Sequence, residues 1–175
     1  KGVKVTYQVY TPEEIEQNSS LGCVQLFYYP AETPNAKTAI VIPGNALTIT
    51  SEMGEGGSTA YELHKRGYAV FVLRYRTFLD LGNNAPLQDL ARAVQLVTSL
   101  DEELSIQTQD YALVGYSSGG QLAGVFANKE RGYGHYGVAR PGALLLGYSV
   151  VNFSEVKIAY QAFMDTGNYG WHYYC

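Results

Sequence analysis

The chain has 175 residues, of which 46% are hydrophobic and 16% are charged, and its formal net charge is −4. This length suits a single folded domain, and the composition excludes a disordered or coiled-coil chain. The 12 lysine and arginine residues are scattered along the chain, so we expect no nucleic acid partner. No apolar run approaches the roughly 20 residues that a membrane span needs, which predicts a soluble chain with no membrane partner.

The cellular compartment and the state of the cysteines stay open. The first residue is Lys1 rather than methionine, which is typical of a processed N-terminus, so the sequence is compatible with a cytoplasmic or an exported protein. Cys23 and Cys175 have no second cysteine or histidine at metal-ligand spacing, and we expect no metal site. We expect Cys23 to be a buried thiol near the start of a strand, and the sequence does not decide whether it is bonded to Cys175.

The N-terminal third of the chain predicts strands. Alternating residues over 3–10 and the run 23–29 predict two antiparallel strands, joined by a turn-rich linker that contains Asn18, Ser19 and Ser20. Residues 38–42 form a continuous apolar run, which is typical of a strand buried on both faces.

From residue 59 onward, predicted helices and strands alternate. The helices are expected at 59–66, after the cap Asn84, and at 119–128, and the strands at 68–73, 111–114 and 143–146. The apolar residues of the middle helix fall on one face: Leu87, Leu90, Val94 and Val97. This alternation predicts an α/β fold, a mostly parallel sheet with helices on both faces, as one domain over residues 1–175.

The main chemical motif is Gly-Tyr-Ser-Ser-Gly-Gly at residues 115–120, between a predicted buried strand and a predicted helix. A serine on a sharp strand-to-helix turn presents its hydroxyl above the sheet, and the helix N-terminus favours negative charge at the same place. We therefore take Ser117 as the candidate nucleophile and the backbone N–H of Ser118 as one oxyanion donor. The alternative is a glycine-rich turn that contains a serine by chance.

Several further motifs follow one another in a fixed order along the chain. They are Pro43-Gly44-Asn45-Ala46, Glu55, residues 66–76, residues 85–89, the serine motif and Arg140-Pro141. Over residues 38–151 the sequence resembles α/β-hydrolases of the acetylxylan esterase and carbohydrate-esterase-like group. In that group a Pro-Gly-Gly-Gly loop supplies the second oxyanion donor, which implies the backbone N–H of Asn45 here.

The resemblance also implies an aspartate and a histidine on later strands, and this chain stops before both. It therefore implies a fold that lacks the last two strands, with the Asp and His supplied by a missing C-terminal segment or a companion chain. Asp165 and His172 stand in the right order for triad partners. The link from the last predicted strand is shorter than a parallel crossover needs, so we expect residues 152–175 to form a cap-region segment instead.

The remaining polar residues receive structural interpretations. Glu55 and Asp89 are expected as charges at helix N-termini, and Arg74 and Arg76 as partners of acidic side chains. Residues 132–137 spell G-x-G-x-x-G but follow a helix and precede a strand, which argues against a dinucleotide site.

The resemblance implies an enzyme, a serine carboxylester hydrolase that removes small acyl groups, above all acetyl, from a carbohydrate or similar polar alcohol through an acyl-enzyme. Such chemistry needs no cofactor, because side chains and backbone dipoles supply it. One alternative is a truncated or degenerate, non-catalytic scaffold that acts as a binding or interaction module. Another keeps the same machinery but acts on a peptide or lipid.

Overall fold

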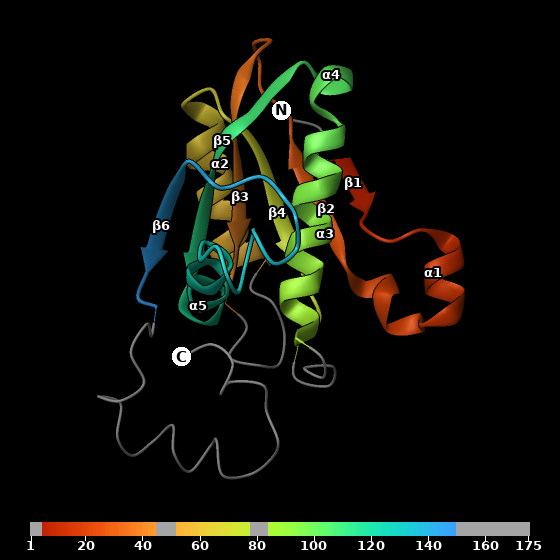
Figure 1. Cartoon of the computed structure of the whole chain (residues 1–175). Helices are drawn as coiled ribbons and strands as arrows, with labels where there is room; N and C mark the ends of the chain where they lie inside the picture. The colour runs from red at the N-terminus through yellow and green to blue at the C-terminus, as the bar shows by residue number, and fades with distance from the viewer. Residues whose placement is uncertain (1–4, 45–51, 78–83, 150–175) are drawn as a thin grey trace.

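The computed structural model describes residues 5–44, 52–77 and 84–149 (Figure 1). Strands in these ranges form one six-stranded sheet in the order β1-β2-β4-β3-β5-β6. The strands are β1 (Val5–Gln8), β2 (Gln25–Tyr29), β3 (Ala36–Ile42), β4 (Ala69–Arg74), β5 (Ile106–Tyr116) and β6 (Ala143–Gly147). The helices are α1 (Pro12–Gln17), α2 (Gly57–Lys65), α3 (Ala85–Ser99), α4 (Asp101–Leu104) and α5 (Ser117–Phe126), with short turns η1 (Ser19–Cys23) and η2 (Glu52–Gly56).

The sheet is mostly parallel. Strands β4, β3, β5 and β6 pair in parallel, whereas β2 runs antiparallel to both of its neighbours, β1 and β4, at one side of the sheet. The carboxyl ends of the parallel strands therefore share one edge, at the lower end of the sheet in Figure 1. Segments that follow β3, β4, β5 and β6 start at this edge, which is where ligands bind in open α/β sheets.

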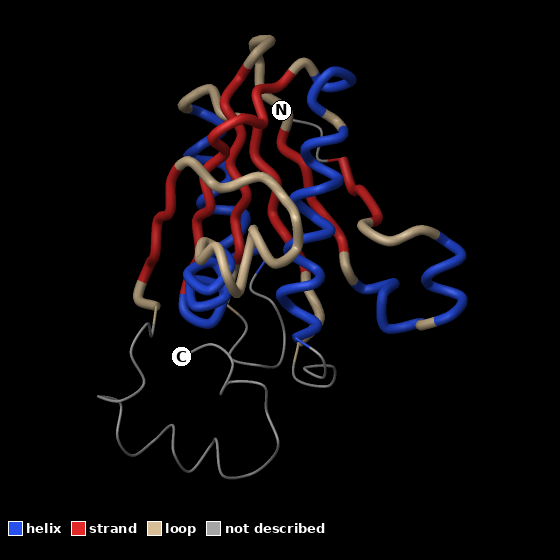
Figure 2. The backbone as a smooth tube through the Cα atoms, viewed as in Figure 1, coloured by secondary structure: helices blue, strands red, loops and turns tan. Residues whose placement is uncertain are grey.

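Helices cover both faces of the sheet, as the sequence predicts. Helices α3 and α5 lie on one face and α2 on the other (Figures 1 and 2). The core divides accordingly, because side chains alternate along each strand. On β3, Ile40 and Ile42 pack with α3 and α5, whereas Ala39 and Val41 pack with Ala60 of α2.

The N-terminal linker holds more regular structure than the sequence predicts. Helix α1 begins at a capping box, in which Thr11 and Glu14 satisfy each other's backbone N–H groups. Glu14 also pairs with Arg92 of α3 at 2.9 Å, which links α1 to α3. Cys23 ends η1 and is exposed, so the expectation of a buried thiol is wrong.

Several element boundaries differ from the prediction, and the largest difference is at the start of β5. Strand β5 begins five residues earlier, at Ile106, because its first residues pair with Ala36 and Lys37 of β3. Helix α5 begins at Ser117 rather than Gly119.

The predicted cap-region segment lies outside the described residues. Within the described ranges, no helix has both the length and the apolarity needed to cross a membrane.

Candidate active site

Ser117 occupies the turn from β5 into α5. Its φ is +49°, in the left-handed region that residues with a side chain rarely adopt. Such backbone strain persists only where the surrounding structure imposes it, and it is frequent at functional sites. The strand, the strained serine and the helix together have the local geometry of a nucleophile elbow.

Glycines are required around this turn because other backbone segments pass against it. A Cβ added at Gly115 would lie 2.5 Å from the Cα of Gly120. One added at Gly119 would lie 2.5 Å from the carbonyl oxygen of Pro43. The start of α5 therefore packs backbone to backbone on the end of β3, which no other residue type allows.

The segment after β3 lies directly against Ser117. A Cβ added at Gly44 would be 2.9 Å from the Ser117 Cβ and 3.0 Å from the Tyr116 carbonyl oxygen. The structure thus brings together the serine motif and the first residues of the predicted oxyanion loop. Asn45, the predicted second donor, lies outside the described residues.

The peptide between Pro43 and Gly44 is hydrogen-bonded on both sides. The Tyr75 hydroxyl donates to the Pro43 carbonyl oxygen at 3.0 Å, and the Gly44 N–H donates to Glu55 Oε2 at 2.5 Å. Glu55 does precede α2, as expected of a helix N-terminal charge, but its carboxylate binds the backbone next to Ser117. Sequence reasoning missed Tyr75, although its place directly after a parallel strand was a usable signal.

Tyr148 adds a second contact to the same carboxylate. It follows β6 with a φ of +40°, and its hydroxyl donates a hydrogen bond to Glu55 Oε1. This hydrogen bond to an anion raises the pKa of Tyr148 to about 12. Its ring also lies 5.7 Å from that of Tyr116, whose hydroxyl is 2.8 Å from Thr59 Oγ1. No motif in the sequence pointed to Tyr148.

A buried ion pair supports the segment after β4. Arg76 Nη2 lies 2.7 Å from Asp89 Oδ1, and the Arg76 backbone N–H donates to Asp89 Oδ2 at 2.9 Å. The Tyr10 hydroxyl donates to the same carboxylate at 2.7 Å. The predicted pairing is confirmed for Arg76, whereas Asp89 is fully buried inside α3 rather than a charge at its N-terminus. Arg74 lies over the Phe27 ring and donates to Gln25.

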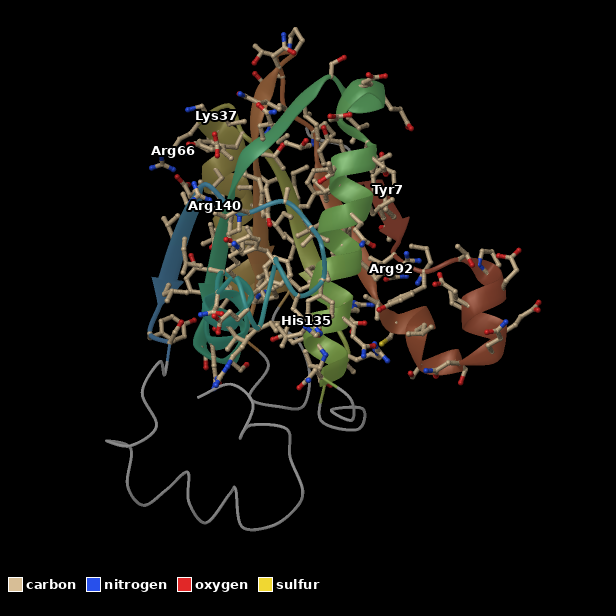
Figure 3. All side chains as sticks on the ribbon, in the orientation of Figure 1. Tyr7, Lys37, Arg66, Arg92, His135 and Arg140 are labelled. Atoms are coloured by element: carbon tan, nitrogen blue, oxygen red, sulfur yellow. The ribbon has the colours of Figure 1, made fainter. Side chains whose placement is uncertain are left out.

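Triad partners for Ser117 are not found among the described residues. His64 lies in the last turn of α2, and His135 lies in an exposed loop with its ring edge-on to Tyr136 (Figure 3). In the described ranges, neither histidine is hydrogen-bonded to the Ser117 hydroxyl. Asp165 and His172 lie outside those ranges. The described part of the chain also contains no group of three or more His, Cys, Asp or Glu side chains that could hold a metal ion.

Comparison with known proteins defines the family. The BD-FAE family model matches residues 25–136, which include the sheet from β2 to β5, the Glu55 region and the serine motif. The chain belongs to the BD-FAE family.

Two curated relatives resemble the BD-FAE chain over part of their length. An acetylxylan esterase from Xylanibacter ruminicola is 28% identical over 153 residues, which are 86% of this chain and 30% of the relative. Endo-1,4-beta-xylanase B from Butyrivibrio fibrisolvens is 27% identical over 121 residues, which are 64% of this chain and 19% of the relative. The chain thus spans less than a third of either relative.

Solved structures show the same fold. The acetyl ester-xyloside bifunctional hydrolase from Caldicellulosiruptor lactoaceticus superposes with a TM-score of 0.72 at 23% identity, covering 89% of this chain and 60% of that one. The carboxylesterase Cest-2923 from Lactobacillus plantarum gives 0.70 at 20% identity, covering 94% and 62%. MGS-M1, an α/β hydrolase from a deep-sea metagenome, gives 0.70 at 22% identity, covering 86% and 58%, so the BD-FAE chain has the predicted α/β-hydrolase fold.

Proposed function

We propose that this BD-FAE chain carries the nucleophile of a serine carboxylester hydrolase. The supporting observation is Ser117 at φ +49° on the β5–α5 turn, with the backbone of Gly44 packed against it. Small acyl groups, above all acetyl, on a carbohydrate or similar polar alcohol are the proposed substrates. This choice rests on the resemblance to proteins described as an acetylxylan esterase and an acetyl ester-xyloside hydrolase.

In the proposed reaction, the Ser117 hydroxyl attacks the ester carbonyl carbon and gives up its proton to a histidine. The tetrahedral oxyanion accepts hydrogen bonds from the backbone N–H groups of Ser118 and Asn45. The bond to the alcohol then breaks, and the histidine returns the proton to the departing alkoxide, which leaves an acyl-serine. Water attacks the acyl-serine by the same route and releases the carboxylic acid.

The histidine and the aspartate that orients it are proposed to come from outside the described residues. Asp165 and His172 are candidates within the chain, and a further segment or a companion chain is the other source. An intact mass of the purified natural protein under denaturing conditions separates these sources. A mass above the 19.2 kDa of this sequence, or a second co-purifying polypeptide, points away from Asp165 and His172.

The proposed nucleophile is tested by replacing each of two neighbouring serines, Ser117 and Ser118, with alanine. The natural protein is incubated with a fluorophosphonate probe and assayed on 4-nitrophenyl acetate and acetylated xylo-oligosaccharides. Ser117→Ala should abolish labelling and lower kcat by roughly 10⁴-fold or more, as loss of a serine nucleophile does elsewhere. Ser118→Ala should keep labelling, because its proposed donor is the backbone N–H.

Two results would contradict this assignment. Labelling that persists in Ser117→Ala would place the nucleophile elsewhere. A folded natural protein that is never labelled and hydrolyses neither ester would support a non-catalytic binding scaffold instead.

A further inference from the structure

Two hydrogen bonds fix the orientation of the peptide between Pro43 and Gly44, one accepted by its carbonyl oxygen and one donated by its N–H. Tyr75 binds its carbonyl oxygen at 3.0 Å and Glu55 binds its N–H at 2.5 Å. Because a peptide group is planar, one bond on each side determines how the plane is rotated about the chain. We call this pair of bonds the 43–44 clamp.

Both side chains of the 43–44 clamp are themselves held by the fold. Tyr75 is 4% exposed, directly follows β4, and precedes Arg76, which is bound to Asp89 of α3. Glu55 lies within η2, directly before α2, and its second carboxylate oxygen accepts a hydrogen bond from Tyr148 after β6. The 43–44 peptide after β3 is thus bound by Tyr75 after β4 and by Glu55 of η2, and Glu55 is in turn bound by Tyr148 after β6.

The clamped peptide lies beside the proposed nucleophile. Gly44 is packed so closely on Ser117 that an added Cβ would come within 2.9 Å of the serine Cβ. Gly119 of α5 packs against the Pro43 carbonyl oxygen. A rotation of this peptide would change the backbone that faces Ser117, and a misplacement of about 1 Å near reacting atoms can cost roughly 100-fold in rate.

We propose that Glu55 and Tyr75 are positioning residues, which hold the 43–44 peptide against Ser117 so that the oxyanion-binding backbone is in place before substrate arrives. This inference rests on the proposed esterase function. It gives Glu55 no proton-transfer step, because both carboxylate oxygens are occupied as hydrogen-bond acceptors. This positioning role requires a hydrogen-bond acceptor at residue 55, but it does not require the negative charge of Glu55.

The test uses the natural protein with matched variants. Glu55→Leu removes the acceptor, and Glu55→Gln keeps an oxygen that can accept from Gly44 while losing the charge. Tyr75→Phe removes only the hydroxyl. Tyr111→Phe is the control, because Tyr111 also donates from a buried hydroxyl to a backbone carbonyl, that of Ala139 at 2.9 Å.

We expect the effects to fall on kcat rather than KM. Glu55→Leu should lower kcat by about 100-fold and Tyr75→Phe by about 10-fold, in the range seen when oxyanion stabilisation is weakened, with KM within about threefold. Glu55→Gln should restore kcat to within about fivefold of the wild type. Tyr111→Phe should leave kcat and KM within about twofold.

Failure of the inference and failure of the proposed function give different results. Unchanged kcat in Glu55→Leu and Tyr75→Phe would overturn the inference and leave the esterase standing. A Glu55→Gln enzyme as slow as Glu55→Leu would also overturn it, because the charge would then be the active property. An unlabelled, inactive wild type would overturn the proposed function, and amide hydrogen exchange at Gly44 would still decide whether Glu55→Leu breaks the clamp.

Discussion

The hydrogen bond from Tyr148 to Glu55 has a measurable titration signature. The hydrogen bond to the Glu55 carboxylate favours the protonated phenol, so the pKa of Tyr148 is raised from 10.0 to about 12. A group with a raised folded-state pKa contributes stability that is fully present below its unfolded pKa. This contact is therefore complete below pH 10 and is lost as pH rises through about 12.

We expect the Tyr148 resonance in a ¹³Cζ-tyrosine NMR titration to move near pH 12, once Tyr148→Phe has assigned it. In Glu55→Gln the midpoint should fall toward 10, because the neutral amide no longer opposes ionisation of the phenol. A wild-type midpoint at 10 would show that the contact is absent in solution.

The Arg76–Asp89 ion pair is almost fully buried. Asp89 is 0% exposed and Arg76 is 6% exposed. We predict that Asp89→Asn lowers the free energy of unfolding by about 3–5 kcal/mol, because it leaves the guanidinium buried without its counter-charge. Urea unfolding measures this loss.

An exposed ion pair provides the comparison. Glu14 and Arg92 are paired at 2.9 Å but remain 38% and 40% exposed. Glu14→Gln should cost less than about 1 kcal/mol, since solvent screens the pair and glutamine can keep the capping box. Equal losses in Asp89→Asn and Glu14→Gln would mean that burial does not strengthen the Arg76 pair.

At the scale of elements, α5 holds two glycines with opposite expected behaviour. Gly119 faces the end of β3, where an added Cβ would overlap the carbonyl oxygens of Ile42 and Pro43. Gly124 has room, since its added Cβ would meet only Leu146 at 4.0 Å. We predict that Gly119→Ala destabilises the protein by about 1–3 kcal/mol through overpacking.

Gly124→Ala should instead stabilise it by about 0.5–1 kcal/mol, because alanine is the better helix former. Urea unfolding of both variants gives the comparison. A Gly119→Ala protein as stable as the wild type would show that α5 can move away from β3 at no cost.

The sequence predicted the elements that carry strong local signals. The apolar face of α3, from Leu87 to Val97, is buried as its spacing indicated. Helix α1 was missed because its six residues bury nothing and depend on a capping box and the contact with Arg92. Asn84 stands at the start of α3 as predicted, yet it is left-handed and its side chain makes no cap hydrogen bond.

At the scale of the whole molecule, the neighbouring elements determine whether residues of an apolar pattern are buried. The run of leucines on β6 suggests burial, yet Leu145 is 51% exposed, because no described strand pairs with its outer edge. The candidate site likewise combines residues that a local motif indicates with residues that only the sheet brings together. The serine motif was visible as a contiguous pattern, whereas Tyr75 reaches Pro43 and Tyr148 reaches Glu55 only through the order of strands in the sheet.

The pairing of β3 with β5 also has a kinetic consequence. Ile42 pairs with Gly115, so Pro43 and Ser117 become neighbours only after a loop that contains α2, β4 and α3 has closed. Parallel pairing across such a long loop is slow, because its entropy must be lost before the contacts form. The proposed reactivity of Ser117 should therefore appear late when the unfolded chain refolds, together with the complete sheet, and partly folded chains should lack the proposed esterase activity.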